Sequence, residues 1–166
     1  MNILRVAFLL CISSSALFAQ SPSIARASRE TQACSSKERL TVSEFEAVMR
    51  QVAEGWNEND ARKAAECFTE DAIYSAPPSF GHEGKEALFQ FFGGEKGRQL
   101  PMHMTWHRLV FDPSQQAGAG EYTFRYKIQT HGVVMVKFSR GKISNWREYE
   151  IESNAPWEQF VGKNRF

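Results

Sequence analysis

The sequence predicts an α+β fold in which three helices come first and pack in the hollow of a curved antiparallel sheet. Two patterns predict it. Apolar residues recur at helical spacing between residues 41 and 92, and alternating apolar and polar residues dominate from 102 to 151. The clearest alternation puts Tyr122, Phe124 and Tyr126 on one face of a strand. Helices laid in a bent sheet leave a cone-shaped cavity at its wide end.

The first helix is expected to begin at Thr41, because Thr41 and Glu44 have the spacing of a capping box. Four apolar residues then follow at helical spacing and indicate about four turns: Phe45, Val48, Val52 and Trp56. Two further helices are predicted over residues 61–68 and 85–92, and glycines follow the second of them.

One short strand is expected between the second and third helices, and the other strands follow the third helix. Residues 72–76 predict a short strand that ends at Pro77, and residues 81–84 a loop. Residues 102–111 predict a long strand. Residues 121–151 predict three more strands, joined by tight turns at His131-Gly132 and at Arg140-Gly141, where glycine permits a positive φ. One helical turn with Trp157 and Phe160 is expected to pack on the edge of the sheet.

The first 19 residues are typical of a signal peptide, with a short basic start and an apolar stretch over residues 6–18. That stretch is shorter than the roughly 20 residues that a bilayer-spanning helix needs. We therefore expect a flexible linker over residues 20–40, a single domain over residues 41–166, and a mature protein without a membrane span. Its expected location is the periplasm or the extracellular space.

Two cysteines remain after removal of the leader, Cys34 and Cys67, in an oxidising compartment. They either form one bridge, or Cys67 packs as a small apolar residue while Cys34 stays in the tail. No Cys/His spacing indicates a metal site, so neither a metal nor a cofactor is expected. The net charge of +1 argues against nucleic acid as a partner.

Two residues are candidates for proton transfer. His107 shares one face of the 102–111 strand with His103, and a histidine titrates near neutral pH. Glu148 lies in the last strand, where its neighbour Arg147 must point to the opposite face. A buried Glu148 beside His107 would be an acid–base pair. The alternatives are a hydrogen-bonded histidine within the sheet and a surface ion pair of Glu148.

Aromatic and histidine side chains are the expected lining of the pocket, because rings with polar tips suit a pocket wall. These residues are Trp56, Tyr74, His103, Tyr126, Trp146 and Tyr149.

Several short motifs carry a family resemblance. They are Trp56-Asn57 with Asp60, residues 68–72, residues 84–88, and Gly141-Lys142-Ile143 followed by residues 146–149. In the order and the residues of these motifs, the chain resembles the SnoaL-like (polyketide cyclase-like) branch of the nuclear transport factor two-like superfamily. The resemblance implies a cone-shaped α+β barrel, a deep apolar pocket and frequent homodimerisation through the outer face of the sheet. It fixes no reaction, because the superfamily includes isomerases, cyclases, dehydratases, epoxide hydrolases and non-catalytic members.

The chain also departs from that pattern. Ala76 stands before Pro77, where a ketosteroid isomerase-like enzyme would carry a carboxylate base. Glu150 and Ile151 occupy the region where polyketide cyclase-like members tend to carry an aspartate. Glu148 is then the nearest candidate, provided that it faces inward.

We therefore expect an exported, homodimeric domain that binds a small apolar or aromatic molecule. One hypothesis is proton-transfer chemistry of the isomerase, cyclase or lyase type. The other is a non-catalytic ligand-binding, dimerisation or interaction module of the cell envelope. The two differ in whether His107 and Glu148 face the cavity without other partners.

Overall fold

The computed structural model describes residues 38–100 and 102–166. The expected signal peptide, most of the expected linker and Cys34 lie outside this part, so the leader and the Cys34–Cys67 bridge stay predictions. None of the described helices is long and apolar enough to cross a membrane.

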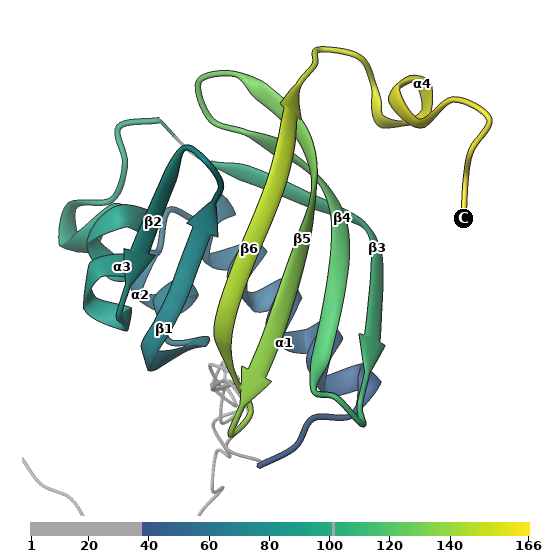
Figure 1. Ribbon diagram of the computed structural model, residues 1–166. Coiled ribbons are helices and arrows are strands. Elements are labelled where there is room, and N and C mark those ends of the chain that lie inside the picture. The colour runs from purple at the N-terminus through teal and green to yellow at the C-terminus, as the bar shows by residue number, and fades with distance from the viewer. Residues whose placement is uncertain (1–37, 101) are drawn as a thin grey trace, which may run out of the picture. The chain divides into compact units, whose positions relative to one another are not determined.

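The described chain forms a six-stranded sheet, and its first three helices lie against one face of that sheet (Figure 1). The strands are β1 (Phe68–Ala76), β2 (Phe80–Glu83), β3 (His103–Asp112), β4 (Ala117–Arg125), β5 (Gln129–Ser139) and β6 (Lys142–Glu152). The helices are α1 (Val42–Asn57), α2 (Ala61–Ala65), α3 (Lys85–Phe92), the 3-10 turn η1 (Gly94–Lys96) and α4 (Trp157–Val161).

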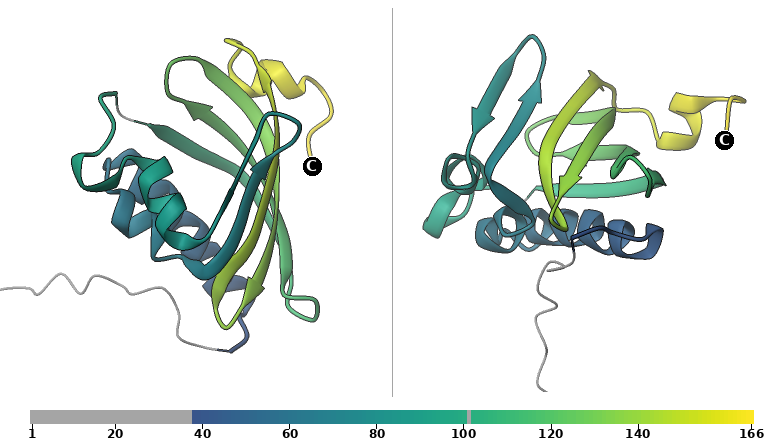
Figure 2. Two further views of the ribbon diagram at one scale, coloured as in Figure 1. Left: turned by 60° about the vertical axis from the view of Figure 1, so that its left-hand side comes forward. Right: turned by 60° about the horizontal axis from the view of Figure 1, so that its bottom comes forward.

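The predicted α+β class is confirmed, with two differences in the sheet. The strand order is β2-β1-β6-β5-β4-β3, so β2 and β3 are open edges and the sheet does not close into a barrel. It is also mixed rather than wholly antiparallel, because β1 runs parallel to β6. The curved sheet folds over α1, which lies along its inner face (Figure 2).

The capping box of α1 is confirmed. The Thr41 hydroxyl accepts a hydrogen bond from the Glu44 amide at 3.3 Å, and the Glu44 carboxylate accepts one from the Thr41 amide at 2.9 Å. The helix then buries its predicted apolar stripe, with Phe45, Val52 and Trp56 all at most 3% exposed. This burial fixes the C-terminal end of α1, and with it Trp56, beneath the sheet.

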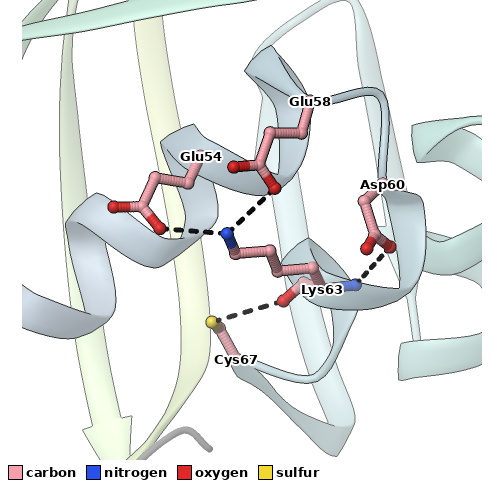
Figure 3. A network of polar contacts seen from close by, with 5 residues as sticks. All are labelled: Glu54, Glu58, Asp60, Lys63 and Cys67. Atoms are coloured by element: carbon pink, nitrogen blue, oxygen red, sulfur yellow. Dashed lines mark hydrogen bonds and ion pairs between the residues drawn. The ribbon is translucent and has the colours of Figure 1, made fainter. Parts of the chain in front are cut away.

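A small polar cluster fixes the corner between α1 and α2 (Figure 3). The Lys63 ammonium lies 3.0 Å from the carboxylates of both Glu54 and Glu58. Burial lowers the pKa of Lys63, but its hydrogen bonds to the two glutamates outweigh this and raise the pKa above its ordinary value. Asp60 caps α2 by accepting from the Lys63 amide at 2.9 Å. The thiol of Cys67, which is buried, lies 3.7 Å from the Lys63 carbonyl oxygen.

The predicted turn at His131-Gly132 is wrong. The strand β4 ends at Arg125, and the connection to β5 covers residues 126–128. His131 and Gly132 therefore lie inside β5. Gly132 is needed for close packing instead. A Cβ atom there would lie 2.7 Å from the ring of Tyr122 and 2.6 Å from the Tyr149 carbonyl oxygen. A glycine that permits close packing looks the same in sequence as one that permits a turn, so the sequence alone does not distinguish the two.

Other boundaries shift less. The strand β1 starts at Phe68 rather than at residue 72, which shortens α2, and β2 occupies part of the expected loop. The turn at Arg140-Gly141 is confirmed, with φ values of 51° and 75°. The short helix α4 forms where a helical turn was predicted, but it packs on the outer face, where Phe160 contacts His131.

Candidate functional site

A cavity of about 200 Å³ opens on the inner side of the sheet. Its wall combines residues of α1, α3 and the inner faces of β1, β3, β4 and β6, and most of them are aromatic or methionine. Only three lining side chains are charged: Arg98, Glu148 and Glu150. The predicted aromatic pocket is therefore present, and these three charges decide what it can do.

Glu148 faces inward from β6 and is 7% exposed. Its Oε1 atom accepts a hydrogen bond from the Tyr74 hydroxyl at 2.9 Å. Its Oε2 atom accepts one from the Trp146 indole at 2.9 Å and a longer one from the Tyr122 hydroxyl at 3.4 Å. A carboxylate can accept about four hydrogen bonds, so these three donors leave one acceptor site on Oε1.

Burial raises the pKa of Glu148 to about 7. The negative charge of Glu150 contributes to this rise and the hydrogen bonds from Trp146, Tyr74 and Tyr122 oppose it, so the pKa of about 7 is the net result. The carboxyl group is thus poised to take up or release a proton near neutral pH. General acid–base catalysis is most efficient with such a group.

Three strands bring the donors together. The parallel register of β1 and β6 puts Tyr74 beside Trp146, and their rings stack at 5.6 Å with an interplanar angle of 8°. Tyr122 reaches across from β4 because Gly132 on β5 leaves room for its ring. Burial and the charge of Glu148 raise the pKa of both tyrosines, so their hydroxyls stay protonated as donors.

The structure does not bring His107 to Glu148. His107 lies where the register of β3 shifts, and its Nε2 atom is 2.7 Å from the Thr123 hydroxyl on the outer face. Its ring stacks on Trp157 of α4 at 4.1 Å. Burial lowers the pKa of His107, and His131 lowers it further, while Glu158 opposes the shift. The expected acid–base pair is corrected to a single group, because alternation along β3 does not show which face is inward.

Thr123 links His107 to a second histidine. The Thr123 hydroxyl lies 2.9 Å from Nδ1 of His131, and Nε2 of His131 lies 2.8 Å from the Ala155 carbonyl oxygen. His131 is 1% exposed although it lies on the outer face, because α4 covers it. We call His107, Thr123, His131 and Ala155 the outer relay.

The other residues predicted to line the pocket also divide between the inner and the outer face of the sheet. Trp56, Tyr74 and Tyr126 line the cavity. Trp146 is fully buried and acts on the site through its bond to Glu148. His103 and Tyr149 are exposed on the outer face and correct the prediction.

Two functional candidates were missed in the sequence. Tyr122 belongs to the predicted inner stripe but was not recognised as a donor to Glu148. Arg98 lies in a connection of polar composition, and no periodicity points to it. Within residues 38–100 and 102–166, no group of three or more His, Cys, Asp or Glu side chains could hold a metal ion.

Comparison with known proteins identifies the family. The SnoaL-like domain matches residues 49–146, which is more than half of the chain. No curated protein matches the chain.

Solved structures share the fold. A protein of unknown function with a cystatin-like fold from Methylobium petroleophilum PM1 is 22% identical with a TM-score of 0.60, covering 72% of this chain and 83% of that one. A proposed ketosteroid isomerase from Kribbella flavida DSM 17836 is 19% identical with a TM-score of 0.55, covering 72% and 87%. An LEH-like epoxide hydrolase from M. tuberculosis is 16% identical with a TM-score of 0.53, covering 63% and 80%. The motifs, the fold and the matched residues agree, and the chain belongs to the SnoaL-like domain family.

Proposed function

We propose that this domain binds a small apolar or aromatic molecule and catalyses proton transfer on it, with Glu148 as the general acid–base. The observation that carries the proposal is the buried carboxyl group of Glu148, which lines an apolar cavity and has a pKa of about 7. Two proteins of similar fold bear the names of enzymes, a proposed isomerase and an epoxide hydrolase, which supports a catalytic reading.

The cavity limits the size of the ligand. An engineered apolar cavity of about 150 Å³ binds benzene, so the cavity of about 200 Å³ suits a molecule with one ring and a short substituent. Its aromatic wall, with rings from Phe91, Phe92 and Phe124, favours a flat ligand.

The chemistry follows from the donors around Glu148. In its ionised form the carboxylate takes a proton from an activated C–H bond of the ligand. The protonated Glu148 then accepts fewer hydrogen bonds, which frees the hydroxyls of Tyr74 and Tyr122 to donate to the oxygen on which negative charge develops. Return of the proton from Glu148 to a second carbon gives an isomer; alternatively, the bond to a leaving group breaks as the C=C bond forms, the leaving group takes the proton from Glu148, and the result is a lyase reaction. Each outcome conserves the proton.

One observation favours the competing function, a binding module without catalysis. Three donors already satisfy much of the hydrogen-bonding capacity of Glu148, and His107 is not in the cavity to assist it. A carboxyl group that accepts three hydrogen bonds also stabilises the wall of a pocket that binds a ligand without converting it. The two functions therefore differ in turnover and not in ligand affinity.

The test uses a ligand found with the protein itself. Native and denatured mass spectra of the purified protein identify a retained small molecule. Its C–H bonds are then followed by NMR in heavy water with the wild type and with the Glu148→Gln variant. We expect the wild type to catalyse deuterium exchange and Glu148→Gln to slow it at least about 100-fold. The His107→Gln variant is the control and should exchange at the wild-type rate. Equal exchange in wild type and Glu148→Gln, or binding without exchange, would contradict catalysis by Glu148.

We also propose that the domain is exported and forms a homodimer. The composition of residues 1–19 supports export, and a mature mass that begins near residue 20 would test it. Exposed apolar side chains on the outer face support dimerisation: Val133, Met135, Tyr149 and Ile151. The native mass spectrum reports the oligomer, and a monomer at micromolar concentration would contradict the dimer.

A further inference from the structure

Arg98 lines the cavity without an anionic partner. No Asp or Glu of the described residues lies within ion-pair distance of its guanidinium. One terminal nitrogen donates to the Phe91 carbonyl oxygen, whereas the buried Nε atom has no hydrogen-bond partner in the described part of the chain. A partly buried cation that lacks a counterion is costly, so a bound ligand with a negative group would be stabilised there.

The backbone of Arg98 is held in place from both sides. The Asn59 side chain accepts a hydrogen bond from the Arg98 amide at 2.8 Å and donates one to the Arg98 carbonyl oxygen at 3.0 Å. Gly93 makes room for this segment, because a Cβ atom there would lie 2.8 Å from the carbonyl carbon of Gly97 and 3.0 Å from the Arg98 amide. The position of Arg98 is therefore fixed by Asn59, which is 39 residues away in sequence, and by the nearby Gly93.

Two aromatic rings orient the side chain. The guanidinium carbon lies 5.2 Å from the ring centre of Phe91 and 5.1 Å from that of Tyr126, and both rings line the cavity. Cation–π contacts of this kind supply only part of the stabilisation that a desolvated guanidinium needs. The terminal nitrogen that does not bond to Phe91 has no partner among the described residues, and a carboxylate oxygen could accept a charge-assisted hydrogen bond from it.

The charges along the cavity set the direction of the ligand. Glu148 is buried, whereas Arg98 is half-buried and Glu150 is exposed, so the cation lies toward the solvent end. Glu150 already accepts a hydrogen bond from the Thr130 hydroxyl at 2.8 Å. A ligand with an apolar ring and one anionic end would put the ring among the aromatic side chains and the anion at Arg98.

We propose that the cavity selects ring compounds that bear a carboxylate, with the carboxylate bound by Arg98 and the ring directed toward Glu148. This inference names the substrate class of the proposed function and rests on the same cavity.

The test compares phenylacetate with phenylacetamide, which has nearly the same shape but no charge, by calorimetric titration. We expect the wild type to bind phenylacetate about tenfold or more tightly than the amide, as a charge-assisted bond predicts. Arg98→Met, which keeps an unbranched apolar stem, should abolish the preference, and Arg98→Lys should retain part of it. The Glu148→Gln variant removes a partly ionised carboxyl group from the same cavity, so it should keep or increase the preference for the acid.

Three results would overturn the inference. They are equal affinity for acid and amide in the wild type, no phenylacetate binding up to about 10 mM, and a preference that survives in Arg98→Met. The wild-type comparison needs no variant, so a folding defect in Arg98→Met does not protect the proposal. The outcome is also separate from catalysis: loss of exchange in Glu148→Gln tests Glu148, and the acid–amide preference tests Arg98.

Discussion

The two faces of the sheet carry polar clusters whose hydrogen bonds end at different groups: a carboxyl group on the inner face and a backbone carbonyl oxygen on the outer face. On the inner face, donors from β1, β4 and β6 converge on the single carboxyl group of Glu148 beside an open cavity. On the outer face, hydrogen bonds run in sequence from His107 through Thr123 and His131 to the Ala155 carbonyl oxygen. The inner cluster has a hydrogen-bond acceptor position left for a ligand, whereas the outer cluster has none.

The outer relay has only one arrangement of protons when both histidines are neutral. The Ala155 carbonyl oxygen can only accept, so Nε2 of His131 carries the proton and its Nδ1 accepts from the Thr123 hydroxyl. The Thr123 oxygen then accepts from Nε2 of His107. Every shared atom is satisfied, which is typical of a structural network. A histidine on a strand is therefore weak evidence of catalysis by itself. Here its hydrogen bonds end at a backbone carbonyl oxygen, which indicates a structural role.

The largest difference between the faces should appear in the Glu148→Gln variant. Glu148 ionises near 4.5 in the unfolded chain and near 7 in the folded protein. Between these values the unfolded state has lost the proton that the folded state keeps, so the free energy of unfolding falls as pH rises. The difference corresponds to roughly 3 kcal/mol, which Glu148→Gln should remove. Urea unfolding at about pH 5 and about pH 8 measures it.

Glu46→Gln is the matched control for that experiment, because it removes a partly exposed carboxylate that lies outside the cavity and pairs with Arg50 at 2.9 Å. It should keep the wild-type dependence on pH. An unchanged dependence in Glu148→Gln would show that Glu148 does not titrate as proposed.

The second prediction breaks the inner cluster without changing its polar atoms. Gly132→Ala places a methyl group 2.7 Å from the Tyr122 ring, so the ring must move away from Glu148. We expect a loss of about 2 kcal/mol in the free energy of unfolding, as overpacking typically costs. Gly81→Ala is the control, because the nearest atom to its Cβ would be 3.7 Å away. Equal stability of the two variants in urea would refute the close approach.

The third prediction breaks the outer relay at its buried end. His131→Leu keeps a side chain of moderate size but leaves the Thr123 hydroxyl and the Ala155 carbonyl oxygen without their partner. We expect a loss of about 1 to 2 kcal/mol and faster proteolysis of the segment after residue 152. Deuterium exchange of the ligand should be unaffected. A loss of exchange in this variant would mean that the outer relay takes part in catalysis.

The smallest effect is expected at the exposed end of the relay. His107→Gln can still donate to Thr123 and loses only the stack on Trp157. The free energy of unfolding should change by less than about 0.5 kcal/mol, as for most surface substitutions. A loss as large as that of His131→Leu would show that the two ends of the relay are equally important.

Much of the fold could be predicted because local patterns encode it. The capping box at Thr41 and Glu44, the helix α3 and the turn at Arg140-Gly141 all form as expected. The turn at His131-Gly132 could not be judged correctly, because the reason for Gly132 is the Tyr122 ring on the neighbouring strand. Tertiary packing of this kind leaves no periodic trace in the sequence.

The site could be predicted only in part for the same reason. Alternation puts Glu148 and Trp146 on one face of β6, but it does not show that β3 turns His107 outward or that α4 covers His131. Arg98 lies in an irregular connection and is positioned by Asn59, which is 39 residues away. Irregular segments carry functional residues without the patterns that strands and helices provide.

The acid–base role of Glu148 is tested most directly by an NMR titration of the glutamate side-chain carboxyl carbons in the ¹³C-labelled protein, with Glu148→Gln to assign Glu148. We expect one resonance to titrate near pH 7 and to be missing from Glu148→Gln. If the resonance lost in Glu148→Gln titrates instead near the ordinary glutamate pKa of 4.5, burial does not shift the pKa of Glu148 and the proposed acid–base role is contradicted.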